Sequence, residues 1–370
     1  QPVFSINGIA IDGYLSDASV RFIPSQQEFA SMQIYGTTDG NGGFTLDFME
    51  EQFLSIDANQ NGKLDPNEGK VVVSGGIDSI TGQRFNSTLS ADANSTVVTP
   101  LTTILSEMIS LGETKQIALD KLSQSFGFSS SIDITHYDPI HEAGKNDENA
   151  KKLLQAGAQV ANIFKQVEGF AKAQGILSNE GMSTVVAAEF ARIANVGDDT
   201  GISLTDARSI ENIITNSLQN VTLNNAPTDE ELTSITQLVK SSNIVLGDSD
   251  IYNLEPAVML TKLSQRQVSI ENEVVSEIGK TSLTELVSQT TAESLKEISN
   301  LQPIPNLFAP SGEKFTVSVD LGSTVNGDKI VKLSVYDLDG DQISASIIDG
   351  NIDSDSDDQS LLLLNDLFEL

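Results

Sequence analysis

The sequence predicts a multidomain α+β chain: a β-sandwich over residues 1–98, an all-α helical bundle over residues 99–302 and a small β-domain over residues 303–370. Three observations predict this. Short apolar runs separated by Gly, Asn and Asp fill the first segment, and a helical apolar period fills the second. A proline-containing linker precedes renewed alternation in the third. At 370 residues, the chain is long enough for two or three cores.

Strands and tight turns are expected in the first segment. Residues 9–14 and 19–23 combine β-branched and aromatic side chains with turn formers. The turn at residues 39–43 leads into alternating apolar residues at 44–48, which predicts a hairpin. Residues 70–73 are expected to form a further strand.

The helical segment is expected to open at Thr99, a capping residue followed by Pro100 at the first helical position. Apolar residues keep helical spacing over residues 101–109 and stop near Gly112. Residues 150–173 repeat that spacing over a longer stretch.

Later helices are expected to start at Ser203 and at Thr228, whose Glu231 completes a capping box. Residues 261–298 carry one long amphipathic pattern. These lengths predict a bundle of six or seven helices.

The strongest motif is the stretch of residues 57–68, which matches a twelve-residue EF-hand calcium loop at every ligand position. The expected ligands are the side chains of Asp57, Asn59, Asn61, Asp65 and Glu68 and the backbone carbonyl of Lys63. Gly62 allows the sharp turn. An Asx-rich surface turn is the alternative. The loop has no second loop of equal quality to pair with and precedes a strand, so a structural clamp is favoured over a sensor switch.

Other groups of residues are weaker metal candidates. Asp337, Asp339 and Asp341 surround a glycine turn and can gather around one calcium ion, with an acidic hairpin turn as the alternative. The acidic residues between 349 and 358 are better explained as a solvated charge run. His136 and His141 flank a proline, which favours a surface loop over a metal site.

Composition limits the partners and the chemistry. The chain has 52 acidic and 21 basic residues and a net charge of -31, which disfavours nucleic acid and anionic membranes and attracts divalent cations. The absence of cysteine excludes disulfides and thiolate metal sites. No apolar stretch is long enough for membrane insertion. No motif for a nucleophile, a phosphate-binding loop or a catalytic metal is present, so no enzymatic activity is expected.

Several short motifs resemble known families. Residues 12–20 and 37–46 are similar to carboxypeptidase-regulatory-like, or CnaB-like, sandwiches. Residues 73–78 and 97–103 resemble a segment of large Gram-negative surface adhesins of the RTX and cadherin-like type, and residues 334–341 are similar to the calcium-binding turn of cadherin-like repeats. The resemblance implies binding and spacer domains, with a cadherin-like fold at the C-terminal end.

These observations predict a calcium-stabilised, secreted adhesion or structural module of a bacterial surface or matrix protein. A self-assembling subunit of an extracellular filament or surface layer, and a portion of a secreted hydrolase, are the alternatives. Gln1 in place of Met is expected after removal of a signal peptide, although a fragment of a longer chain would look the same. The expected partners are neighbouring copies or domains of the same protein and a cell-surface or matrix ligand. The apolar residues 361–370 are expected either to complete the last domain or to pair with another chain.

Overall fold

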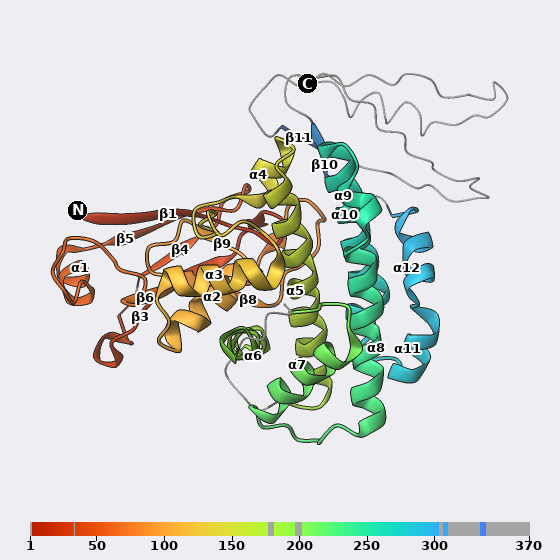
Figure 1. Ribbon diagram of the computed structural model, residues 1–370. Helices are drawn as coiled ribbons and strands as arrows, with labels where there is room; N and C mark the ends of the chain where they lie inside the picture. Colours follow the sequence, from red (N-terminus) through yellow and green to blue (C-terminus); the bar gives the residue numbers. More distant parts are fainter. Residues whose placement is uncertain are drawn as a thin grey trace.

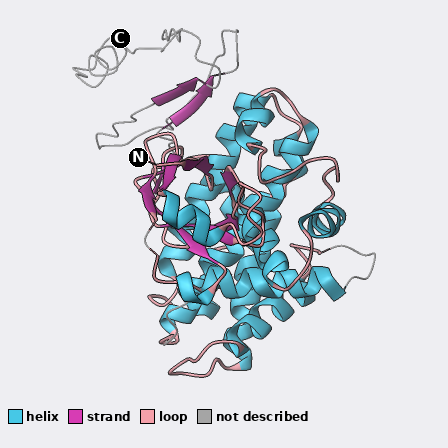
Figure 2. Cartoon of the chain, turned by 90° about the vertical axis from the view of Figure 1, so that its left-hand side faces the viewer, coloured by secondary structure: helices cyan, strands magenta, loops and turns pink. Residues whose placement is uncertain are grey.

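Small sheets come first along the chain, and a mostly helical region follows them (Figure 1). The computed structural model describes residues 2–32, 34–176, 181–196, 202–302, 306–309 and 334–337. Within these residues the protein is α+β, as the sequence predicts. The N-terminal strands gather on the side of the molecule that faces the viewer in Figure 2, and most of the helices lie around and behind them.

Short strands build two main sheets and one strand pair. They are β1 (Phe4–Ala10), β2 (Leu15–Ser16), β3 (Ser19–Pro24), β4 (Tyr35–Thr37), β5 (Gly43–Phe48), β6 (Gly69–Ser74), β7 (Ile77–Asp78), β8 (Thr88–Asp92) and β9 (Val97–Val98). One sheet has the order β4-β3-β6-β8, the other β5-β1-β9, and β2 pairs with β7. Among these nine strands, all pairs are antiparallel except β1 with β9. The strand expected at residues 70–73 is confirmed as β6.

The hairpin expected around residues 39–43 is wrong. Strand β4 pairs with β3, whereas β5 pairs with β1 in the other sheet, so the turn carries the chain between sheets. The Asp39 carboxylate accepts hydrogen bonds from the backbone N–H groups of Asn41 and Gly43, both at 2.9 Å, which closes the turn locally. Phe48 of β5 meets Phe22 of β3 edge to face at 5.1 Å. Alternation identified the buried face of β5 correctly but not its pairing partner.

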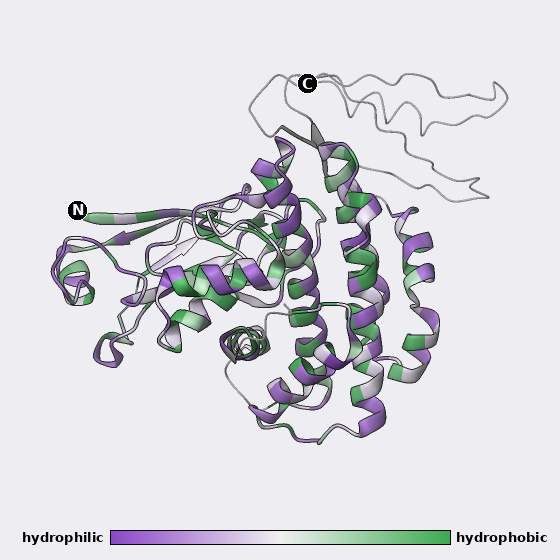
Figure 3. Cartoon of the chain, viewed as in Figure 1, coloured by the Kyte–Doolittle hydropathy of each residue, from purple (hydrophilic) through white to green (hydrophobic). Residues whose placement is uncertain are grey.

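The helices are mostly short and lie largely after β9. The α-helices are α1 (Glu50–Ile56), α2 (Pro100–Ser110), α3 (Lys115–Phe126), α4 (Pro139–Gly144), α5 (Glu148–Ala173), α6 (Met182–Val196), α7 (Ala207–Gln219), α8 (Asp229–Leu246), α9 (Ser249–Tyr252), α10 (Pro256–Glu273), α11 (Leu283–Gln289) and α12 (Ala292–Ser299). The 3-10 helices are η1 (Gln27–Phe29) and η2 (Val275–Glu277). Polar and apolar residues alternate along the long helices (Figure 3).

Two helix starts are confirmed and one is wrong. Thr99 caps α2, with Pro100 at the first helical position, and Thr228 forms a capping box with Glu231 at α8. Helix α7 is capped by Asp206 rather than Ser203, because the Asp206 carboxylate accepts the free N–H of the first turn.

The single long pattern predicted over residues 261–298 is interrupted. Helix α10 ends at Glu273, and α11 and α12 then start at their own caps, Ser282 and Thr291. Gly279 has a φ of 85°, a left-handed conformation that turns the chain between them. The apolar period survives the break, which is why it suggested one helix. The described residues therefore hold more helices than the six or seven expected.

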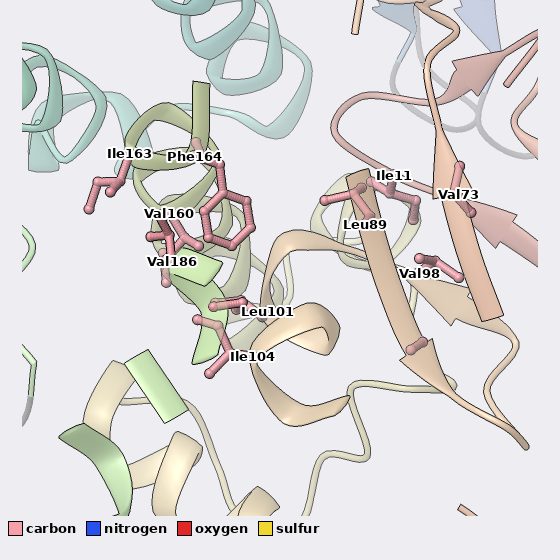
Figure 4. Close-up of a cluster of buried hydrophobic side chains, with 14 of the residues drawn as sticks. Ile11, Val73, Leu89, Val98, Leu101, Ile104, Val160, Ile163, Phe164 and Val186 are labelled. Carbon is pink, nitrogen blue, oxygen red and sulfur yellow. The ribbon is translucent and has the colours of Figure 1, made fainter. Parts of the chain in front are cut away.

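One apolar core continues from the sheets into the helices. Figure 4 shows Val73, Leu89 and Val98 of the strands on one side of α2, and Leu101 of that helix on the other side, toward Phe164 of α5. Helix α2 is buried along almost its whole length. The change from strand to helix falls where the sequence predicts it, but apolar packing does not stop there.

A buried row of amide side chains joins the antiparallel helices α5 and α8. Gln159 donates to the backbone carbonyl of Asn243 at 2.8 Å, and Asn162 donates to the Asn243 side chain at 2.8 Å. Gln166 donates to Asn162 at 2.8 Å and to Ser242 at 2.9 Å. These contacts pair most of the polar groups that lie between two apolar helix faces, although Oε1 of Gln166 has no partner among the described residues.

The C-terminal segment is described only in part. Strand β10 (Asn306–Ala309) pairs in parallel with β11 (Ser334–Asp337) and lies beside α10. The predicted acidic run at residues 349–358 and the apolar residues 361–370 lie outside the described residues. Among the helices that the structure describes, none is both long and apolar enough to cross a bilayer.

Candidate calcium loop and a buried charged joint

The predicted calcium loop connects a helix to a strand. Helix α1 ends at Ile56, the loop runs from Asp57 to Glu68, and β6 starts at Gly69. Gly62 adopts a φ of 78°, as the turn of an EF-hand loop requires. Helix α1 lies at the far left of Figure 1, away from the helical region. The strand after the loop is confirmed, whereas the helix before it was not predicted.

The first and last loop positions carry buried carboxylates. Asp57 is 2% exposed and Glu68 is 4% exposed. The two oxygens of Asp57 accept from the N–H groups of Asn61 at 3.0 Å and Gly62 at 2.8 Å. Those of Glu68 accept from the N–H groups of Ala58 at 2.7 Å and, at the other oxygen, Asp65 at 2.8 Å. Each oxygen keeps a second acceptor site, because a carboxylate can accept about four hydrogen bonds.

The remaining candidate ligands are exposed or half-buried and bond to one another. The Asn59 and Asn61 amides donate to the same oxygen of Asp65, at 2.6 and 2.9 Å. Their own carbonyl oxygens accept loop N–H groups. The Lys63 carbonyl accepts no hydrogen bond from the described part of the chain and is free to bind a cation. In this arrangement, the amide N–H groups of Asn59 and Asn61 contact Asp65 in the place that a bound cation would take.

The donor set fits a hard cation. All six candidate ligands present oxygen atoms, the atoms that Ca²⁺ prefers. Burying two carboxylates without a positive partner is unfavourable, and among the described residues no Lys, Arg or His forms an ion pair with Asp57 or Glu68. Nowhere in the described ranges do three His, Cys, Asp or Glu side chains gather closely enough to hold a metal ion. Calcium binding would therefore need the Asn59 and Asn61 amides to turn their oxygens inward, and the site stays a prediction.

The other predicted candidates are described only in part. Asp337 is the last residue of β11, and Asp339 and Asp341 lie outside the described residues. His136 and His141 are both exposed on their side-chain atoms, at 46% and 38%. The prediction that both histidines lie on a surface loop is wrong for His141. Pro139 is the first residue of the short helix α4, which carries His141.

A second charged group, which the sequence did not reveal, lies between the strands and the helices. It consists of Asp12, Asp78, Lys165 and Glu271, here called the charged joint. Asp12 follows β1, Asp78 ends β7, Lys165 belongs to α5 and Glu271 to α10. The Lys165 ammonium lies 2.8 Å from Asp12 and 3.9 Å from Glu271. It also lies 5.8 Å from the centre of the Phe85 ring.

Asp78 is held by neutral donors instead. One oxygen accepts from the N–H groups of Ile80 at 2.9 Å and Thr81 at 3.4 Å, and the other accepts from the Thr81 hydroxyl at 2.7 Å. Gly13, with a φ of 80°, packs directly on this carboxylate: a Cβ there would lie 1.9 Å from Oδ1 of Asp78. Only glycine fits at this position.

Burial changes the proton affinity of these groups. It raises the pKa of Asp78 to about 6, and the nearby charge of Asp12 adds to this effect. Burial also raises the pKa of Glu271, against the opposing effect of Lys165. Burial would lower the pKa of Lys165, but Asp12 and Glu271 outweigh it and hold that pKa above its ordinary value. The ammonium therefore stays charged while the carboxylates compete for it.

No local signal in the sequence points to the charged joint. Its members come from four elements that are distant along the chain, and Lys165 lies within the helical pattern of α5 as an ordinary charged residue. The motifs at residues 12–20, 73–78 and 97–103 resemble known families but do not indicate a charged group. In the structure these three segments all approach the contact between strands and helices. Comparisons with protein-family models, curated proteins and solved structures found no match.

Proposed function

We propose that this chain is a calcium-stabilised adhesion or structural module of an extracellular bacterial surface or matrix protein. The observation that carries the proposal is the loop from Asp57 to Glu68, which buries its first and last carboxylates without a basic partner in the described residues. Its spacing matches an EF-hand loop throughout. A divalent cation supplies the missing positive charge.

The position of the loop supports a structural role for the cation. Asp57 ends a helix whose Phe53 and Ile56 lie in the core, and Glu68 precedes β6, an inner strand of its sheet. A cation bound to both carboxylates would tie α1 to that sheet. Since the described residues contain one such loop, a paired sensor that opens on binding is not favoured. Extracellular modules of this kind bind calcium with a Kd of about 10⁻⁴ to 10⁻³ M.

The wider proposal rests on composition and motif resemblance. A net charge of -31 suits a calcium-rich external medium. The proposal includes a β-sandwich for the strands, a bundle for the helices and a cadherin-like C-terminal domain. Its partners are neighbouring copies of the chain and a surface or matrix ligand.

Thermal unfolding of the intact chain tests the calcium site. Protein stripped with EDTA should melt at a higher temperature after calcium is added, by the equivalent of about 2.7 kcal/mol at a hundredfold excess over Kd. Asp57→Ala and Glu68→Ala should remove most of that shift. Glu51→Ala, an exposed change on α1, is the matched control and should keep it. An identical melting curve with and without calcium in the unchanged protein would reject the proposal.

Light scattering of the same samples addresses assembly. Particles that grow on calcium addition would support the self-assembling alternative, and particles of constant size would favour a module that binds other ligands.

A further inference from the structure

The charged joint links the strands to the helices through the contact between Lys165 and Asp12. We propose that the joint is a pH-sensitive clasp, closed most tightly in acidic medium and loosened at neutral pH. It differs from the calcium loop in place and in chemistry. Its charge balance, its burial and the cavity beside it support this role.

The charge balance of the joint is unequal. Three carboxylates, Asp12, Asp78 and Glu271, share the single ammonium of Lys165. The Asp12 side chain is 2% exposed, so solvent does little to screen the excess negative charge. Lys165 bonds to Asp12 and approaches Glu271, which leaves Asp78 with neutral donors. Asp78 is therefore the group that gains most from a proton.

Protonation of Asp78 needs no movement of heavy atoms and only a rotation of the Thr81 hydroxyl hydrogen. Its Oδ1 can keep the N–H bonds from Ile80 and Thr81, while a protonated Oδ2 donates to the Thr81 hydroxyl, which can accept as well as donate. The bond between these two groups reverses its direction and stays in place.

The surrounding groups do not neutralise the joint. From the strands, Arg84 is exposed and forms none of the described ion pairs. From α5, Glu168 binds Lys172 at 2.7 Å and accepts from Ser87 at 2.8 Å, so this pair is already satisfied. The other facing groups are Tyr14, which donates to Asp138 at the start of α4, and Asn272 of α10, which accepts from Gln83. Burial raises the pKa of Asp138 as well, so proton binding at Asp138 affects stability in the same direction as proton binding at Asp78.

A cavity next to the joint gives the elements room to shift. It measures about 60 Å³ and is lined by Asp12 and Gly13 and by apolar residues of α4, α5 and α10, among them Ile140, Leu154 and Leu263. A volume of this size admits a few water molecules. Incomplete packing at the contact between strands and helices lowers the cost of opening it.

The sign of the pH effect follows from Asp78. Its folded-state pKa of about 6 lies above the ordinary value of 3.8, so the folded protein binds this proton more tightly than the unfolded chain does. The contribution to stability is therefore greatest below about pH 4 and is lost as pH rises through 6. A shift of this size changes the opening equilibrium roughly ten- to hundredfold.

Distance measurements between two spin labels test the clasp in the full chain. The protein has no cysteine, so Glu28→Cys in the strand region and Thr233→Cys on α8 provide unique labels at exposed sites. In EDTA, the distance distribution should broaden between about pH 5 and 7.5 in the otherwise unchanged protein. Asp78→Asn mimics the protonated carboxyl and should keep the narrow distribution at both pH values.

Denaturant midpoints measured at the same pH values provide a second readout that needs no labels. The midpoint of the unchanged protein should fall on going to neutral pH more steeply than that of Asp78→Asn. Asp250→Asn, an exposed acid on α9, controls for the loss of one surface charge and should retain the slope of the unchanged protein. If Asp78→Asn keeps both the full pH slope and the broadening, the clasp is wrong. A label distribution that does not change with pH in the unchanged protein also overturns it.

Discussion

The calcium loop and the charged joint both bury carboxylates, yet they hold them in different ways. In the loop, Asp57 and Glu68 accept hydrogen bonds only from backbone N–H groups of the same twelve residues. In the joint, Asp12 bonds to Lys165, which lies on a helix far along the chain. The loop can thus form as a local unit, whereas the joint exists only when strands and helices are both in place.

This difference separates two kinds of response. A local set of oxygens with spare acceptor sites is suited to a divalent cation, as proposed for the loop. A long-range set with one ammonium among three carboxylates is suited to protons, as proposed for the joint, because its one described positive charge is already engaged. The following variants test whether the two regions are as independent as this comparison implies.

The largest effect is expected from cutting the chain after residue 98. Residues 1–98 alone should fail to fold cooperatively, because α2 covers β8 and the Thr102 and Thr103 hydroxyls bond to the backbone of Ser90 at 2.9 Å. Exposing this core would exceed the about 5–15 kcal/mol that holds a typical domain together. Circular dichroism and NMR dispersion of fragments 1–98 and 1–302 measure the outcome. Cooperative unfolding of 1–98 would make the strand region an independent domain.

Removing the positive charge of the joint should have the next largest effect. Lys165→Met leaves three carboxylates without an ammonium and should destabilise the protein by about 3 kcal/mol at neutral pH. The cost should shrink in mild acid, as Asp78 and Glu271 take up protons. Lys152→Met, at an exposed position of the same helix, should change stability little. Equal costs for the two variants in urea unfolding would show that Lys165 does not hold the joint.

Two glycines compare the regions directly. Gly13 and Gly62 have nearly the same positive φ, 80° and 78°, but a Cβ at Gly13 meets the Asp78 carboxylate, whereas one at Gly62 meets nothing within 4 Å. Gly62→Ala should cost about 1–2 kcal/mol from backbone strain alone. Gly13→Ala should cost about 2–5 kcal/mol, because overpacking adds to the strain. Urea midpoints of the two variants give the difference, and similar values would mean that Asp78 moves aside freely.

The sequence predicted part of the local structure, although the helix start at Ser203 was wrong, and it missed the contacts between distant segments. The α2 start at Thr99 and the capping box at Thr228 follow from adjacent residues, and the loop of residues 57–68 was recognisable because its candidate ligands are contiguous. The pairing of β5 with β1 depends on which strand lies opposite, and alternation carries no information on that. Interrupted helices such as α10 and α11 keep one apolar period, so their break was not visible.

The charged joint could not be predicted from the sequence for the same reason. Asp12 and Lys165 are separated by most of the strand region and three helices, and neither stands in a pattern that predicts a partner. A half-buried lysine such as Lys165 is recognised only after the fold brings apolar residues around it. Its role is a property of the tertiary contact, not of either segment.

The buried amide row between α5 and α8 has a mechanical consequence. The two helices run antiparallel, so pulling them apart along their axes loads the bonds from Gln159, Asn162 and Gln166 in shear. Sliding by one helical turn, about 5.4 Å, would break these bonds together and leave their polar groups without partners among apolar side chains. Apolar contacts alone permit gradual slippage, but this row demands one abrupt rupture. Under tension, the pair should therefore hold its length up to a threshold force and then yield in a single step.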